Sequence, residues 1–163
     1  MKRIITLSTI CLSIILSNLY GQNSGGMSPP DFNAEKAAGI FQYDIDEVVK
    51  KIKIVDSIHQ NAVTAAISEY NKEMDELSLL NASEFRNLED DFDRNIQIAI
   101  RNRDRSQMDG VKAEIQRIIP PIRNQVIQHE KALNESMALI VSDQQYQKWL
   151  KYQERKRKSE ENQ

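Results

Sequence analysis

Turn-forming residues almost disappear from this chain beyond residue 33. From there on it has only two glycines, Gly39 and Gly110, and two prolines, the adjacent Pro120 and Pro121. Strands are joined by tight turns that depend on these residue types. Because a sheet would have almost nowhere to turn, the sequence predicts an all-α fold.

Three stretches carry apolar residues at intervals of three or four, the spacing of amphipathic helices. The first stretch, from Ile45 to Leu77, indicates either one long bent helix or two helices in succession. The second runs from Phe85 to Ile100, and the third runs from Met108 to Ile140. The third stretch keeps its phase across Pro120 and Pro121, which therefore predict a kink rather than a helix end.

Seven polar residues, 101–107, separate the second stretch from the third and predict either a turn or a weak continuation of the helix. With 28% charged and only 6% aromatic residues, a thin assembly is favoured over a thick globule. We therefore expect an elongated, bent helical hairpin of four to five amphipathic helices. Its narrow apolar stripes favour a homodimer that forms a cradle.

The first residues have the order of a secretory signal peptide. Lys2 and Arg3 precede an apolar run from Ile4 to Leu16, which is short for an uncleaved anchor of about 20 residues. We expect a signal peptide at 1–21, a flexible N-terminal arm at 22–32, a helical domain at 33–158 and a polar tail at 159–163. The expected compartment is the periplasm. Cleavage would remove Cys11, the single cysteine, so disulfides and thiolate metal sites are excluded.

Three places share the pattern of a helix start, in which a capping residue follows an apolar one and Glu or Gln comes three positions later. The caps are Asp44, Asn81 and Ser142, with Glu47, Glu84 and Gln145 as their partners. Each is predicted to begin a helix.

The third of these places, Val141-Ser142-Asp143-Gln144-Gln145 followed by Tyr146, resembles the Leu-Thr-x-x-Gln motif of the Spy/CpxP family of periplasmic proteins. Val replaces Leu and Ser replaces Thr, while Gln145 is retained. The resemblance implies a helical hairpin dimer with a curved cradle. It also implies an ATP-independent chaperone, a stress-sensor regulator or a metal-responsive protein.

Charge and residue types exclude several functions. Loss of Lys2 and Arg3 leaves 20 of the 22 basic residues against 24 acidic ones, a net charge of −4, so nucleic acid is not an expected partner. His59 and His129 lie far apart in the sequence and have no evident nucleophile or second metal ligand. We expect no enzyme activity, no catalytic residues, no metal and no cofactor.

Four arginines, Arg94, Arg101, Arg103 and Arg105, lie near the polar interruption. Together with the apolar Phe85, Phe92 and Met108 they form the candidate client-binding surface, because charge can attract a partly unfolded chain and apolar groups can hold it. The alternative is a solvated turn balanced by Asp104 and Asp109. The basic run at the C-terminal end complements a helix dipole, and binding of this tail to anionic lipid is a further alternative.

The expected function is therefore that of a periplasmic, ATP-independent chaperone that binds unfolded or partly folded envelope proteins. A regulator that docks on the sensor domain of an envelope kinase is the first alternative. A structural coiled-coil component is the second.

Overall fold

The computed structural model describes residues 31–161. Of these, residues 32–161 belong to one compact unit. The predicted signal peptide and most of the predicted arm lie outside the described residues. No strand occurs between residues 31 and 161, so the predicted all-α fold is confirmed there. None of the helices in that range has the length and apolar character that a bilayer crossing requires.

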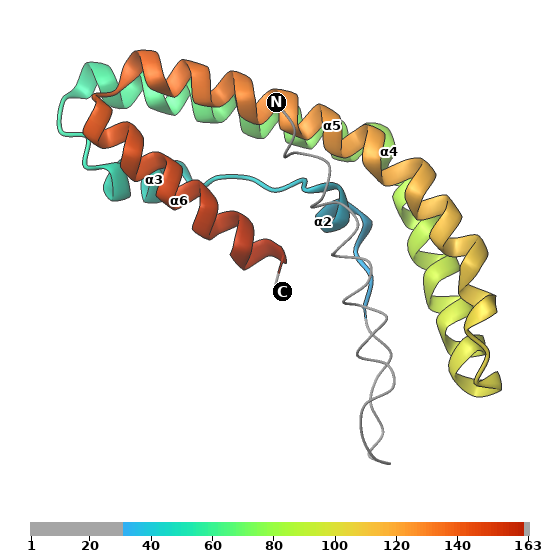
Figure 1. Cartoon of the computed structure of the whole chain (residues 1–163). Coiled ribbons are helices and arrows are strands. Elements are labelled where there is room, and N and C mark those ends of the chain that lie inside the picture. The colour runs from blue at the N-terminus through green and yellow to red at the C-terminus, as the bar shows by residue number, and fades with distance from the viewer. Residues whose placement is uncertain (1–30, 162–163) are drawn as a thin grey trace, which may run out of the picture. The chain divides into compact units, whose positions relative to one another are not determined.

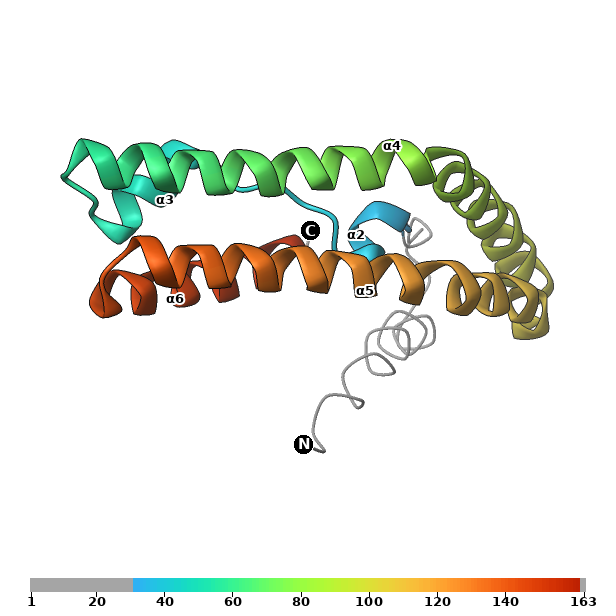
Figure 2. The same cartoon turned by 90° about the horizontal axis from the view of Figure 1, so that it is seen from above.

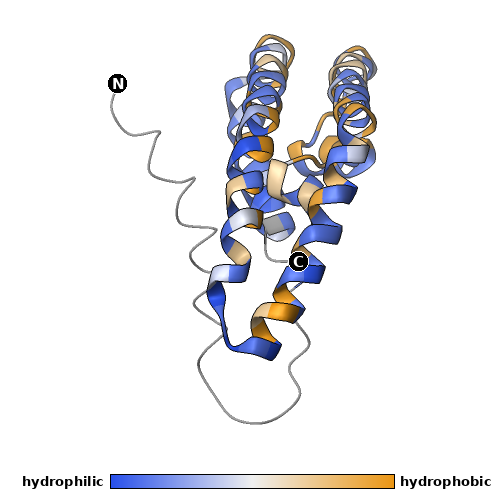
Figure 3. Ribbon diagram, turned by 90° about the vertical axis from the view of Figure 1, so that its right-hand side faces the viewer, coloured by the Kyte–Doolittle hydropathy of each residue, from blue (hydrophilic) through white to orange (hydrophobic). Residues whose placement is uncertain are grey.

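Two antiparallel helices, α4 (Ser57–Asn102) and α5 (Asp109–Ile140), form the bent hairpin seen in Figures 1 and 2. At 1.5 Å per residue, the 46 residues of α4 extend for about 69 Å. Most residues of the second and third predicted stripes are buried between α4 and α5, and Figure 3 shows apolar segments along both helices. The first stretch is buried only in part, because Val55 and Ile58 within it are exposed. Pro120 and Pro121 lie inside α5, which continues through them within the curved pair.

The predicted helix start at Asn81 is wrong, because α4 runs through this position without interruption. Asn81 lies four residues after Leu77 and four before Phe85, both buried, and so falls within the stripe that faces α5. Its Nδ2 donates to the Leu77 carbonyl oxygen at 2.7 Å, which satisfies the amide inside a continuous helix.

The polar interruption forms the tip of the hairpin. α4 ends before Arg103, a left-handed residue with φ 53°, and the short 3₁₀ helix η2 (Arg105–Met108) leads into α5. The Asp104 side chain accepts from the Ser106 amide at 2.9 Å and caps η2. Residues 101–110 are therefore a turn between two helices.

Three shorter helices pack against the hairpin: α2 (Ala34–Ala38), α3 (Ile45–Ile52) and α6 (Asp143–Glu161). The first apolar stretch therefore forms two helices. α3 ends at Lys53, which has a φ of 60°, and α4 begins after its cap, Asp56. Figure 1 shows α3 and α6 side by side along the hairpin. This α3–α6 layer carries most of the chemistry described below.

Candidate functional site

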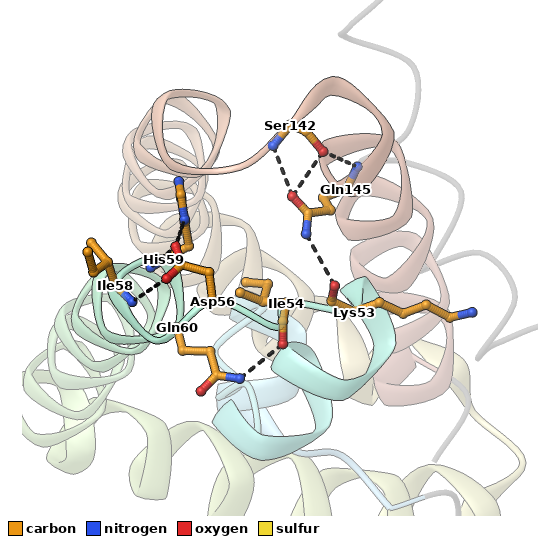
Figure 4. A network of polar contacts seen from close by, with 8 residues as sticks. All are labelled: Lys53, Ile54, Asp56, Ile58, His59, Gln60, Ser142 and Gln145. Atoms are coloured by element: carbon orange, nitrogen blue, oxygen red, sulfur yellow. Dashed lines mark hydrogen bonds and ion pairs between the residues drawn. The ribbon is translucent and has the colours of Figure 1, made fainter.

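A small polar network ties the start of α6 to the break between α3 and α4 (Figure 4). Gln145 Oε1 accepts from the Ser142 amide at 3.1 Å and from Ser142 Oγ at 2.9 Å, while the Gln145 amide approaches Ser142 Oγ at 3.5 Å. Gln145 Nε2 donates to the Lys53 carbonyl oxygen at 3.2 Å. The predicted cap at Ser142 is confirmed, and the motif glutamine also reaches α3.

The other confirmed cap, Asp44, accepts from the Glu47 amide at 2.7 Å and begins α3. At the start of α4, Asp56 accepts from the Ile58 amide at 3.1 Å and also contacts the imidazole of His59. Hydrogen bonding to the His59 ring and to the Ile58 amide holds the pKa of Asp56 below its ordinary value of 3.8. The starts of α4 and α6 therefore meet the end of α3 at this corner.

Behind the corner, Trp149 is fully buried and joins α6 to the rest of the fold. Its Nε1 donates to Asn134 Oδ1 on α5 at 2.6 Å, and its ring lies edge-on to Tyr43 with centroids 4.9 Å apart. Tyr146, which follows the motif, is only half-buried. The aromatic cluster of Tyr43, Tyr70, Trp149 and Tyr152 belongs to the hydrophobic core, because its rings are almost completely buried.

One charged pair lies beside these rings. Arg157 Nη2 donates to Glu130 Oε2 at 2.6 Å, and the Glu130 side chain is only 10% exposed. Glu130 Oε1 and Tyr70 Oη are buried without a hydrogen-bond partner. Burial raises the pKa of both Tyr43 and Tyr70 well above the ordinary value, because the phenolate would lose its hydration.

The structure separates the predicted client-binding residues into two groups. Arg94, Arg101, Arg103 and Arg105 are exposed along the end of α4 and the tip, and Arg94 pairs with Asp91 at 3.2 Å. Phe85, Phe92 and Met108 are each only 3% exposed. Because they belong to the stripe between α4 and α5, they cannot supply the apolar part of an open surface in this conformation.

Other apolar side chains are strongly exposed. Leu79 and Leu80 on α4 are 78% and 81% exposed, and Val55, Ile58 and Leu139 lie at the end of the hairpin where α4 begins and α5 ends. Val55 and Ile58 belong to the first apolar stretch, so their exposure corrects the expectation that its spacing marks a buried face throughout. Leu79 falls outside the three-and-four spacing, two residues after Leu77, whereas Leu80 lies three residues after Leu77 and is not distinguished by the spacing.

The two histidines lie in separate surroundings. His59 contacts Asp56, and His129 Nδ1 lies 3.7 Å from Glu73 Oε2 on the neighbouring helix. Among residues 31–161, no three side chains of His, Cys, Asp or Glu come together as metal ligands would. One of these contacts therefore lies at the start of α4, and the other joins α4 to α5.

Comparisons with protein-family models, with curated proteins and with solved structures found no significant match to this chain. The resemblance to the Spy/CpxP family therefore stays a prediction, and function must be inferred from the residues themselves.

Proposed function

We propose that this chain is an ATP-independent, chaperone-like protein of the periplasm that transiently binds unfolded or partly folded proteins. The observation that carries the proposal is the adjacent pair Leu79 and Leu80, which are strongly exposed on α4 while the neighbouring Leu77 and Phe85 are buried against α5. Covering a leucine side chain stabilises a complex by about 1.5–3 kcal/mol. Two leucines can therefore hold a non-native chain without a specific pocket.

The basic tip supplies the second half of the proposal. Arg101 and Arg103 are exposed, while the neighbouring carboxylates serve other donors: Asp104 caps η2, and Asp109 pairs with Lys112 at 2.9 Å. Positive charge at the end of the hairpin would raise the rate at which acidic segments are encountered. The leucines would then set how long such a segment stays bound.

The decisive experiment measures aggregation of an unrelated denatured protein in the presence of a stoichiometric amount of this chain, expressed without residues 1–21 and without ATP. We expect suppression by the wild type and clear loss of suppression in Leu79→Ser/Leu80→Ser. The matched control is Lys72→Ser/Glu76→Ser, which removes an exposed ion pair from the same helix. If the control loses as much activity as the leucine variant, the leucines are not the binding surface.

The same assay separates this function from the alternatives. A regulator of a sensor kinase would bind one sensor domain and leave general aggregation unaffected. A structural component would do neither. The proposal includes a homodimer, which light scattering at micromolar concentration tests directly, since a monomer would remove the dimeric cradle.

A further inference from the structure

Residues of α3 and α6 line a groove of about 430 Å³ beside Tyr152 of the aromatic cluster. Its lining includes five cationic side chains and a single carboxylate. The lining residues are Glu47 and Lys51 of α3 and Lys148, Lys151, Tyr152, Arg155, Lys156 and Ser159 of α6. Tyr152 Oη donates to Glu47 Oε2 at 2.8 Å, so the one carboxylate is already engaged.

Most of these cations have no acidic partner. Lys156 pairs with Glu160, and Arg155 interacts electrostatically with the adjacent Glu154. Lys51, Lys148 and Lys151 form no ion pair with any carboxylate in residues 31–161. Cations placed together without counterions repel one another, so the arrangement is unfavourable unless an anion enters. This is notable in a chain whose formal net charge is −2.

The dipole of α6 accounts for only part of this arrangement. Cations are stabilised within the last turn of a helix, and that argument fits Lys158 near the end of α6. Lys148 and Lys151 lie in the first half of α6, where the dipole does not favour them. They recur with Arg155 at helical spacing on one face, opposite Lys51.

We propose that the α3–α6 groove binds a phosphate group, carried either by an anionic lipid headgroup or by a soluble phosphoester. Lysine ammonium groups bind phosphate as point-charge donors, and four of the five cations here are lysines. The volume matches a small ligand or a headgroup rather than a long peptide.

The test uses the chain expressed without residues 1–21 and two probes. Inorganic pyrophosphate is titrated by calorimetry, and vesicles of phosphatidylcholine with phosphatidylglycerol are sedimented with the protein, each at low and at physiological ionic strength. The groove variant is Lys148→Gln/Lys151→Gln/Arg155→Gln. The control variant, Lys72→Gln/Arg117→Gln/Lys131→Gln, removes the same residue types and the same charge from exposed positions outside the groove.

We expect the wild type to bind at least one probe and the control variant to bind nearly as well. Since each basic residue near an anionic surface contributes about fivefold, the groove variant should bind vesicles about 100-fold more weakly. Binding of pyrophosphate alone would identify a soluble phosphoester, and binding of vesicles alone a headgroup; either supports the proposal.

Four results would overturn the proposal. The wild type could bind neither probe at low ionic strength, or the groove and control variants could lose equal affinity for the probes. The protein could bind vesicles made only of phosphatidylcholine as well as those with phosphatidylglycerol, or it could bind polyglutamate in preference to both phosphate probes. The last result would assign the groove to an acidic protein segment instead. Circular dichroism and the emission of Trp149, next to Lys148, verify that the groove variant stays folded.

Discussion

Gln145 connects two helices that are far apart in the sequence: its side-chain nitrogen donates to the carbonyl oxygen of Lys53, 92 residues earlier, at 3.2 Å. Lys53 is a left-handed residue at which α3 ends. A residue other than glycine is disfavoured in this conformation, so an external hydrogen bond helps to hold it. The glutamine of the motif therefore supports both the start of α6 and the end of α3.

This dual role predicts the order of two cap mutations. Ser142→Ala should lower the free energy of unfolding by about 1 kcal/mol, as loss of a cap usually does. Gln145→Ala should cost at least as much, because it removes the acceptor for Ser142 and the donor to Lys53. Thermal and chemical unfolding measure both. Gln144→Ala, at an exposed neighbour, serves as the control and should be nearly neutral.

The burial of Trp149 predicts a large effect at the centre of α6. Trp149→Ala should lower the free energy of unfolding by about 3–5 kcal/mol, because it leaves a cavity against Tyr43. Trp149→Phe keeps a ring there and loses the bond to Asn134, so it should cost clearly less. Denaturant unfolding followed by circular dichroism compares them. Equal losses in the two variants would show that the hydrogen bond, not the ring, fixes α6.

The pair of Arg157 and Glu130 predicts an asymmetry between breaking and replacing a charged contact. Arg157→Met leaves the almost buried Glu130 carboxylate without its partner and should cost about 3 kcal/mol. Adding Glu130→Gln to the same chain should restore a substantial part of this loss, because no uncompensated charge is then buried. A double mutant no more stable than Arg157→Met would place the contribution of Arg157 in packing rather than in charge.

Alkaline pH should unfold the protein through its buried phenols. Burial raises the folded-state pKa of Tyr43 and Tyr70 above the ordinary value of 10.0. Their contribution to stability is therefore complete below pH 10 and is lost as the pH rises beyond it. Tyrosinate absorbance should rise together with the loss of helical circular dichroism. Tyr43→Phe/Tyr70→Phe should move the alkaline midpoint upward, and an unchanged midpoint would mean that other groups control it.

The tip arginines should affect capture and leave the fold intact. Arg101→Ser/Arg103→Asn/Arg105→Ser is the suitable variant, since asparagine tolerates the left-handed conformation of residue 103. We expect slower capture of acidic clients and a weaker dependence on salt, with thermal stability changed by about 1 kcal/mol or less. Stopped-flow binding at two salt concentrations measures this. An unchanged capture rate would move the encounter surface away from the tip.

Local patterns explain which parts of the fold could be predicted. The caps at Asp44 and Ser142 depend on contacts three residues apart, which the sequence displays directly. The same pattern at Asn81 failed because its position also continues the apolar stripe of α4, and packing against α5 overrides a local stop signal. The burial of Phe85 and Phe92 could have been predicted from that stripe, since both lie on it.

The groove lay beyond sequence analysis for a different reason. Lys51 and Lys148 become neighbours only because Tyr43, Trp149 and the bond from Gln145 to Lys53 bring α6 alongside α3. Nothing in the spacing of the basic residues along α6 indicates what stands opposite them. The exposure of Leu79 was closer to prediction, since Leu79 departs from the three-and-four spacing, whereas Leu80 lies three residues after Leu77 and fits it.

The position of α6 also has a consequence for the order in which the molecule is completed. The α4–α5 hairpin closes across a short turn and can form as soon as its own residues are available. Tyr43 and Glu47 are synthesised much earlier than their partners on α6. The contact of Tyr43 with Trp149 and that of Glu47 with Tyr152, which lies 105 residues later, can form only once α6 has been synthesised. A chain cut before Asp143 would keep its hairpin and present its tyrosines to solvent. The last helix therefore distinguishes a finished molecule from one that is still being synthesised or has been clipped.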